Sequence, residues 1–322
     1  MILAGIDEAG YGPLLGPLVV GCCAFELDAD PAAEELPCLW KRLRKICRKT
    51  HSRSGNRLHV NDSKLVNQNG LKELERSVLA FAGTIEQPQA RLDELLRLVA
   101  PHVLDELADY RWYASPAEEQ FPIENQPATI AVFSNALRQE MKTAHTNCMY
   151  LAARVVLEKQ FNRMIDRTRN KASALFSTAA MHLDYLLRAH GTEGLVIFCD
   201  RQGGRGHYGS LLRLMFDEWD LEVSRETDDG HSEYRLFKRE HVVRVIFREK
   251  AEAQCLPVAL ASMLSKYLRE ALMHRFNAFW TTHLPGLQPT AGYYTDGSRF
   301  LRDIQLKRAE LGIKDAELVR SR

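Results

Sequence analysis

Short apolar runs, bounded by turns or charged residues, predict the strands of a sheet in this chain. Several of them are too short for a helix, and β-branched residues are frequent in them. Two such runs at the start, joined by a glycine-rich turn, predict a hairpin. The predicted strands are residues 1–8, 17–27, 81–88, 194–199, 234–237 and 242–247.

Helical periodicity occupies the segments between these runs. Apolar positions recur at helical spacing in residues 65–79 and 257–276, and residues 90–190 are largely helical with interruptions near four prolines. Strands in hairpin order, followed by alternating helix and strand, predict a mixed sheet with helices on its faces. The expected class is therefore α/β.

Composition and charge narrow the picture. The 322 residues, 45% of them apolar, are enough for a sizeable core, and we expect one large domain. The net charge of +1 excludes a uniformly basic surface but not a local basic face. Residues 41–60 carry eight Lys/Arg and no acid, which fits a phosphate-contacting surface or an ordinary solvated loop. Residues 217–233 hold eight acids and predict a solvated linker or sheet edge.

Cellular location follows from what the sequence lacks. No apolar run approaches the roughly 20 residues of a membrane-spanning helix, and the start lacks the layout of a signal peptide. The seven cysteines are an odd, scattered set without a C-x-x-C pair, which is typical of reduced thiols. We therefore expect a cytoplasmic protein with no membrane partner.

Carboxylates at the ends of predicted strands are the candidate chemistry. Asp7 and Glu8 end the first strand, Asp200 ends the strand at 194–199, and Glu270 lies in the helix near the end of the chain. Burying an ionised group is costly without a partner, and converging carboxylates are typical ligands of Mg²⁺ or Mn²⁺. Taken singly, each of these acids except Asp7 fits an exposed or ion-paired carboxylate better than a metal ligand.

Five motifs resemble those of type 2 ribonuclease H, ribonuclease HII, and occur in the order found in that family. The segment Gly5–Pro17 (GIDEAGYGPLLGP) resembles the family pattern G-I-D-E-A-G-R-G-P-x-x-G-P. The other four are NDSKL at 61–65, GLVIFCD at 194–200, ASMLSKYLREALM at 261–273 and GYYT at 292–295. Tyr11 stands where the pattern has arginine.

The resemblance implies an architecture. It predicts a ribonuclease H-like mixed five-stranded sheet flanked by helices, with a catalytic core over residues 1–270. Helical insertions are expected near 28–60 and 90–170. Residues 271–322 are expected to form a C-terminal helical segment that closes the substrate cleft.

The resemblance also implies the site. Asp7, Glu8, Asp200 and Glu270 would hold two Mg²⁺ or Mn²⁺ ions. Neighbouring strand residues point to opposite faces, so the turn after Ala9 would have to release Glu8 toward the site. Glu252 matches a family aspartate near the site and receives no firm role. The expected substrate-binding residues are Gly10, Tyr11, Gly12, Lys64, Arg201, Lys266, Tyr293 and Thr295, with Arg201 in a glycine-rich loop that fits a bare surface loop equally well.

The expected function is a metal-dependent endonuclease. It would hydrolyse the RNA strand of RNA/DNA hybrids, or cut at ribonucleotides embedded in duplex DNA, by two-metal-ion hydrolysis that leaves a 3′-hydroxyl and a 5′-phosphate. Two alternatives remain open at this stage. One is a catalytically reduced nucleic-acid-binding module of the same fold, and the other is a nuclease for another DNA or RNA structure. The protein is expected to act on nucleic acid as a monomer.

Overall fold

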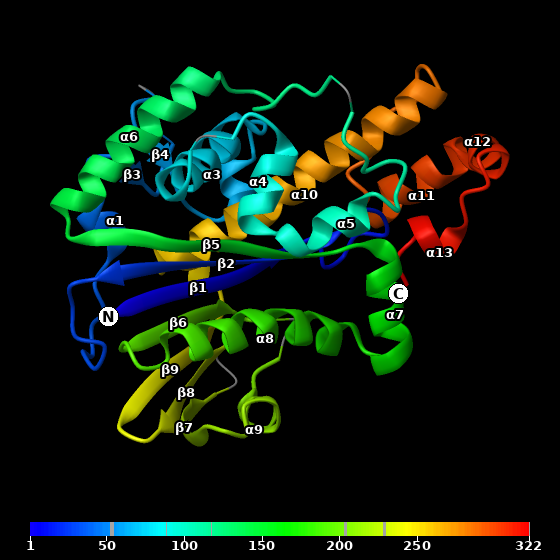
Figure 1. Cartoon of the computed structure of the whole chain (residues 1–322). Coiled ribbons are helices and arrows are strands. Elements are labelled where there is room, and N and C mark those ends of the chain that lie inside the picture. The colour runs from blue at the N-terminus through cyan, green and yellow to red at the C-terminus, as the bar shows by residue number, and fades with distance from the viewer. Residues whose placement is uncertain (52–54, 88, 117, 203–204, 228–229, 322) are drawn as a thin grey trace.

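A seven-stranded mixed sheet forms the centre of the molecule (Figure 1). The computed structural model describes all residues except 52–54, 88, 117, 203–204, 228–229 and 322. The predicted α/β class is confirmed, although the sheet has seven strands and not five. Their order across the sheet is β5 (Thr146–Val156), β2 (Leu18–Leu27), β1 (Ile2–Ala9), β6 (Leu195–Asp200), β9 (His241–Arg248), β8 (His231–Lys238) and β7 (Asp220–Glu226).

Three neighbouring strands run in the same direction at the middle of this sheet. β1 is antiparallel to β2, as the predicted hairpin requires, and parallel to β6, which in turn is parallel to β9. The carboxyl ends of β1, β6 and β9 therefore meet at one edge. In open α/β sheets this edge is where ligands bind.

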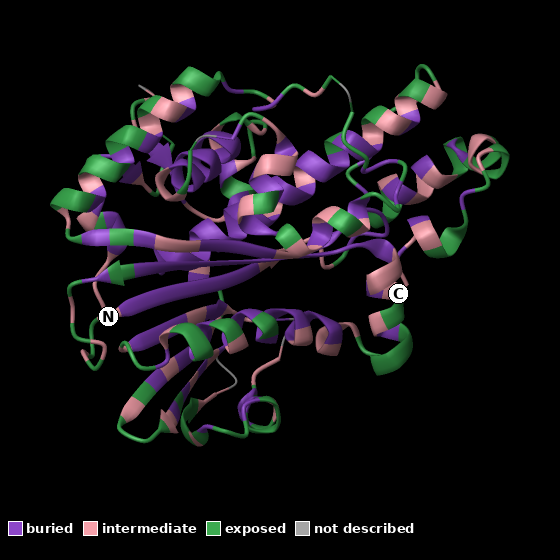
Figure 2. Cartoon of the chain, viewed as in Figure 1, coloured by how far each residue is buried: buried purple, intermediate pink, exposed green. Residues whose placement is uncertain are grey.

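The residues of β1 are buried along most of the strand (Figure 2), and they alternate between two apolar clusters. Ile2, Ala4 and Ile6 belong to the apolar cluster that contains α7 (Glu158–Thr168) and α8 (Lys171–His190). Leu3 belongs to the cluster on the opposite face, which contains α10 (Leu256–His283). A strand that is buried on both faces reads as a continuous apolar run, as the opening of this sequence does.

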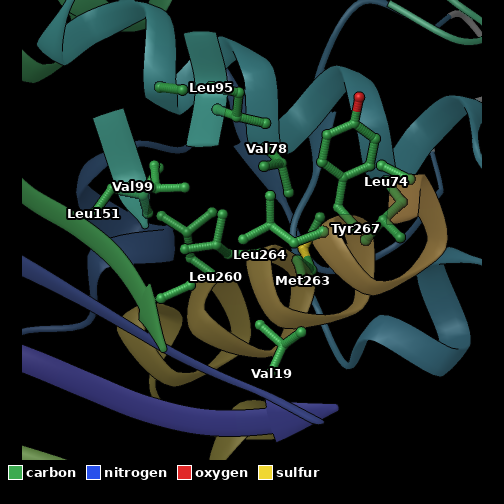
Figure 3. Packing of buried hydrophobic residues seen from close by; sticks show 14 of the residues in the cluster. Val19, Leu74, Val78, Leu95, Val99, Leu151, Leu260, Met263, Leu264 and Tyr267 are labelled. Carbon is green, nitrogen blue, oxygen red and sulfur yellow. The ribbon is translucent and has the colours of Figure 1, made fainter. Parts of the chain in front are cut away.

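Helix α10 packs directly on β1 and β2. A Cβ atom at Gly5 would lie 2.2 Å from the carbonyl carbon of Pro257, and one at Gly21 would lie 2.5 Å from the Ala261 oxygen. Glycine at these two positions lets the helix backbone approach the sheet. On its other side α10 packs against α3 (Lys72–Ile85) and α4 (Leu92–Val99), with Leu264 and Tyr267 beside Val78 and Leu74 (Figure 3).

The remaining elements are short, apart from α6 (Pro127–Thr143), which packs against α3. They are α1 (Leu39–Arg42), β3 (Cys47–Arg48), β4 (Leu58–His59), α2 (Ser63–Val66), η1 (Pro101–Val103), α5 (Leu104–Leu107), α9 (Gly209–Met215), η2 (Ala251–Ala253), α11 (Tyr294–Asp303), α12 (Gln305–Glu310) and α13 (Asp315–Leu318). The last of these packs against α7, so the end of the described chain returns to the sheet (Figure 1). No helix in the described part of the chain is long and apolar enough to cross a membrane.

Two sequence predictions of secondary structure are wrong. Residues 81–85 continue helix α3 and do not form a strand, because Leu74, Val78 and Phe81 follow helical spacing and are buried together. The strand beside β2 is β5, which lies inside the segment predicted to be a helical insertion. Buried and partly exposed positions alternate only weakly along β5, so the sequence pattern does not distinguish this strand from a buried helix.

Other predictions hold or change in detail. The acidic segment contains β7, which is the edge strand of the sheet, as expected from its charge; Asp228 and Asp229 lie outside the described residues. The described part of residues 28–60, which excludes 52–54, contains one helical turn and the two short strands β3 and β4, so it is not mainly helical. The predicted boundary at residue 270 falls within α10, which continues without a break to His283.

Candidate active site

Three strand ends bring three carboxylates to one edge of the sheet. The pairing of β1 with β6 ends at Ile6 and Cys199, so Asp7 and Asp200 follow next on adjacent strands. β9 ends opposite Asp200, and the next turn, η2, carries Glu252. The backbone N–H of Ala251 donates a hydrogen bond of 3.1 Å to Oδ1 of Asp200. This bond attaches the Glu252 turn to the end of β6.

Glu8 joins this group without leaving its strand. It remains paired with Val20 of β2, so the expected release by the turn does not occur. Because β6 stops pairing after Ile6, the end of β1 extends past its neighbour, and this side of the strand is open. The charge of Asp200 acts on Glu8, and Glu8 lines the same pocket as Lys64. The overhang of β1, and not a turn, gives Glu8 access.

All four carboxyl groups are shifted in the same direction. Burial, followed by the charges of Glu8 and Asp200, raises the pKa of Asp7 well above its usual range. Burial and the charge of Asp200 raise the pKa values of Glu8 and Glu252 to about 7 each. Burial also raises the pKa of Asp200. Burial is the main physical cause and repulsion between the acids adds to it, and a cation among the four groups would counteract both.

The donor set fits a hard divalent cation. Oε2 of Glu8 and Oε2 of Glu252 are buried and accept no hydrogen bond from the residues that the structure describes. An unpaired buried carboxylate oxygen is costly, and Mg²⁺ and Mn²⁺ prefer oxygen ligands. The cluster therefore offers oxygen ligands of the right type, and two of these oxygens lack a hydrogen-bond partner in the described part of the chain, whose place such an ion would take. Its members are Asp7, Glu8, Asp200 and Glu252.

Glu270 lies apart from this group. Ser265, on the same helix, donates to the backbone oxygen of Asp7 over 3.1 Å, and Ser262 hydrogen-bonds to the Asp7 carboxyl group. Glu270 follows Ser262 by eight residues, which is about 12 Å along the axis of α10. Its carboxylate accepts a 2.6 Å hydrogen bond from Nζ of Lys266. The structure thus groups Glu252, and not Glu270, with the other three acids.

A pocket of about 220 Å³ opens beside the carboxylates. The glycine-rich turn forms one wall, and two lysines and a tyrosine stand around it. The residues that line it are Glu8, Ala9, Gly10, Tyr11, Gly12, Pro13, Ser63, Lys64, Lys266 and Tyr293. Most of the predicted substrate-binding residues therefore lie together.

Lys64 reaches this pocket from α2. Asp62 caps the helix by accepting a 2.7 Å hydrogen bond from the backbone N–H of Lys64, and the exposed Lys64 side chain lowers the pKa of Glu8. Asp62 itself adds negative charge to the cluster, since it raises the pKa values of Asp200 and Glu252. One short helix thus contributes a positive charge on the pocket side and a negative charge on the carboxylate side.

The loop before α11 holds Tyr293 at the pocket. The Gly292 oxygen accepts backbone hydrogen bonds of 2.8 Å from Leu14 and 3.2 Å from Leu15, which fixes this loop to the glycine-rich turn. Thr295 is exposed on the first turn of α11 and is not among the residues that line the pocket. The structure therefore brings Tyr293, and not Thr295, to the pocket wall.

Arg201 is engaged within its own loop. Its Nε donates to the Arg205 oxygen over 3.1 Å, and Nη1 lies 3.7 Å from Oε2 of Glu249. Gly203 and Gly204, which were expected to approach a phosphate, lie outside the described residues. Arg201 follows Asp200 directly in the chain, but these two contacts bind its guanidinium to Arg205 and Glu249.

Sequence reasoning gave three residues of this site too little weight. Glu252 follows the strand predicted at 242–247, so the rule that selected Asp7 and Asp200, an acid after a buried strand, also selects it. Ser262 lies on the sheet face of α10 by helical spacing. Arg320, which donates hydrogen bonds to the backbone oxygens of Gly10 and Tyr11 in the glycine-rich turn, has no such signal, because only the tertiary structure brings it there.

A second group of potential metal ligands lies near α3. Single ligand atoms of His51, His59 and Glu73 lie within 4.8 Å of one another. Both carboxylate oxygens of Glu73, however, accept 2.6 Å hydrogen bonds from Nη2 of Arg76, and Nε2 of His59 lies 3.0 Å from the Lys49 oxygen. The carboxylate of this cluster is thus already paired with an arginine.

Comparison with known proteins gives structural neighbours. No protein-family model matches the sequence, and no curated protein matches it. The chain is similar, at 14% identity each, to three solved structures. They are the ribonuclease HII of Archaeoglobus fulgidus in its complex with PCNA (TM-score 0.44, covering 100% of this chain and 95% of that one), the ribonuclease H2 of Pyrococcus horikoshii OT3 (0.40, 99% and 92%) and Bst-RNase HIII in complex with Mn²⁺ (0.43, 99% and 66%).

Proposed function

We propose that this protein is a divalent-metal-dependent endonuclease of the ribonuclease H type. Its substrate would be the RNA strand of an RNA/DNA hybrid, or a ribonucleotide embedded in duplex DNA. The observation that carries the proposal is the convergence of Asp7, Glu8, Asp200 and Glu252 beside a pocket whose walls are a glycine-rich turn and two lysines. The five motifs that resemble ribonuclease HII support the same reading.

We assign the metal site to Asp7, Glu8, Asp200 and Glu252, with Glu252 in the place first expected for Glu270. When Mg²⁺ or Mn²⁺ is bound, it supplies Lewis-acid stabilisation of the charge that develops on a phosphodiester. Asp7 is central, because the charges of both Glu8 and Asp200 act on it. Ser262 and Ser265 hold its side chain and backbone, and so orient it toward the other acids.

The rest of the pocket would hold the nucleic acid. Lys64 and Lys266 place positive charge at the pocket, beside Glu8, where a phosphate of the substrate backbone would bind. The backbone of Gly10 and Gly12 allows close approach to a sugar, and a 2′-hydroxyl is the group that separates RNA from DNA. Tyr293 adds an exposed ring at the rim. We propose no role for Arg201 or Thr295 in this first contact.

The cysteines support a reducing compartment. All seven are free, and six of them are buried. Burial raises the pKa of Cys148 and Cys255 to about 12, so these thiols are protonated and unreactive at neutral pH. We accordingly place the protein in the cytoplasm.

The test is a cleavage assay with Mg²⁺ or Mn²⁺ on four duplexes of one sequence: an RNA/DNA hybrid, DNA with a single ribonucleotide, all-DNA and all-RNA. We expect cleavage of the first, the second or both, with 3′-hydroxyl and 5′-phosphate ends, and none of the others. Asp7→Asn and Asp200→Asn should abolish cleavage while the circular dichroism spectrum stays unchanged. Binding of the duplexes without cleavage in either metal would instead favour a nucleic-acid-binding module, and equal cleavage of all-DNA would favour another nuclease.

A further inference from the structure

A buried arginine from the last described residues lies beneath the glycine-rich turn. Only 2% of the Arg320 surface is exposed. Its Nη1 donates to the Gly10 oxygen, and its Nη2 donates to the Tyr11 oxygen over 3.1 Å. Its backbone N–H donates to the Leu14 oxygen over 2.9 Å. One residue thus holds the turn at three points.

The surroundings of Arg320 fix its position in turn. The guanidinium lies 3.9 Å from the centre of the Phe161 ring, on α7. Asn162, the next residue, donates to the Val319 oxygen over 2.8 Å and accepts from the Ser321 backbone over 2.6 Å. The flanking residues of Arg320 are therefore both tied to α7, and the side chain has little freedom to leave the turn.

A buried acid lies near the arginine. Glu158, the first residue of α7, is buried and interacts electrostatically with Arg320, and Oε1 of Glu158 accepts a 2.7 Å hydrogen bond from the hydroxyl of Tyr113. Tyr113 and Glu158 both belong to the segment 90–170, whose role the sequence left open. This segment and the end of the chain converge under the same turn.

The bonds to Arg320 determine which way the turn's amides point. In a trans peptide unit the C=O and the N–H lie on opposite sides. Because the carbonyls of Gly10 and Tyr11 point to Arg320, the N–H groups of Tyr11 and Gly12 point away from it. Neither N–H has a hydrogen-bond partner among the described residues. Both residues line the pocket, and Arg320 does not.

We propose that Arg320 is a positioning residue, which holds the amides of Tyr11 and Gly12 toward the pocket so that they donate to an oxygen of the substrate. Two successive N–H groups that point the same way form a concave site for an anionic or strongly polar oxygen. The inference rests on the proposed nuclease function for the identity of the substrate, but the geometry of the turn is independent of it. Arg320 touches no reacting atom and acts through the turn.

The first test measures the turn without any substrate. In protein labelled with ¹⁵N-tyrosine, the Tyr11 amide of the native chain should be rigid, with an order parameter of about 0.85. In Arg320→Met it should fall below about 0.6, and in Arg320→Lys it should lie between, because a lysine reaches one carbonyl and not both. The matched control is Arg275→Lys, since Arg275 is also buried and binds Asp93 and Glu119 away from the turn. It should leave Tyr11 rigid.

The second test measures catalysis on the hybrid and ribonucleotide substrates. A misplaced turn should lower kcat about tenfold or more in Arg320→Met and change KM less than about threefold, because the lysine contacts persist. Arg320→Lys should recover part of kcat. If the native protein cleaves nothing, the proposed function fails and the order parameter alone decides the inference. An unchanged Tyr11 order parameter in both Arg320 variants, or equal loosening in the Arg275 control, would overturn it, as would an unaltered kcat.

Discussion

The backbone N–H of Ala251 donates to Oδ1 of Asp200, and this bond ties the turn that follows β9 to the carboxylate at the end of the parallel strand β6. It leaves the other side of the Asp200 carboxylate for its neighbours in the cluster. It also places the next residue, Glu252, at the cluster, where it interacts with the Asp200 side chain. The fourth acid of the site therefore comes from the sheet edge and not from helix α10.

Replacing Glu252 and Glu270 one at a time by glutamine tests which of them is the fourth acid of the site. Glu252→Gln should reduce cleavage by at least about a hundredfold, because it removes a metal ligand from a preorganised site. Glu270→Gln should reduce it by less than about fivefold, since it breaks only a half-buried ion pair and leaves Lys266 at the pocket. Single-turnover rates in Mg²⁺ measure both. A larger loss in Glu270→Gln than in Glu252→Gln would restore the assignment first made from the sequence.

The carboxylate cluster makes stability depend on pH and on metal. Because the folded-state pKa values of Glu8 and Glu252 are raised from 4.5 to about 7, their contribution to stability is fully present below pH 4.5 and is lost as the pH rises to about 7. The melting temperature of the metal-free protein should therefore fall as the pH rises from 4.5 to about 7. Mg²⁺ should restore it near pH 7 and have little effect near pH 5, because protons then occupy the ligands.

Differential scanning fluorimetry with and without Mg²⁺ measures this shift. Glu158, whose pKa burial also raises to about 7, adds a slope of the same sign that does not respond to metal. The double variant Glu8→Gln/Glu252→Gln is the control: it should remove the response to Mg²⁺ and the part of the pH slope that comes from these two acids, and it should keep the slope that comes from Glu158. Stabilisation by Mg²⁺ that is equal at pH 5 and pH 7 would contradict this account.

The two glycines of the turn should behave differently. A Cβ at Gly10, whose φ is +84°, would lie 2.5 Å from the Pro17 oxygen, so Gly10→Ala should destabilise the fold by roughly 1–3 kcal/mol. A Cβ at Gly12 meets nothing within 4 Å. Gly12→Ala should change stability by less than about 0.5 kcal/mol.

Activity in Gly12→Ala should nonetheless fall when it is compared with the native protein at equal folded fraction. The methyl group of Gly12→Ala projects from an exposed position at the pocket, where we place the substrate, so kcat/KM should fall about tenfold or more. Urea denaturation and steady-state kinetics on the same preparations give both numbers. Native activity in Gly12→Ala would show that the substrate does not approach this part of the turn.

The two pocket lysines should set the salt dependence of binding. Lys64→Met and Lys266→Met should each weaken binding of hybrid duplexes and lower the slope of log K against log salt by about 1, if each contacts one phosphate. Lys307→Met is the control, because Lys307 lies on α12, pairs with Glu310 and is not among the residues that line the pocket. It should leave the slope unchanged. Fluorescence anisotropy in Ca²⁺ or with Asp7→Asn measures binding without cleavage. If neither pocket variant changes the slope, then Lys64 and Lys266 do not contact phosphate.

Much of the fold and part of the site were predictable from local sequence. The apolar runs at β1, β2 and β6 and the helix α10 follow from periodicity, because their burial is continuous or repeats at a fixed interval. Strand β5 did not follow, since its pattern is equally compatible with a helix and its place beside β2 depends on a partner far away in the chain.

Residue types and their order along the chain determined that acids end the central strands and that glycine-rich turn residues follow the first of them. Tertiary structure decided which acids meet. Strand register sets Asp7 beside Asp200 and aims η2 at them, whereas the 1.5 Å rise per residue of α10 carries Glu270 away. It also decided that Arg320 supports the turn, because a contact across 310 positions of sequence leaves no local pattern.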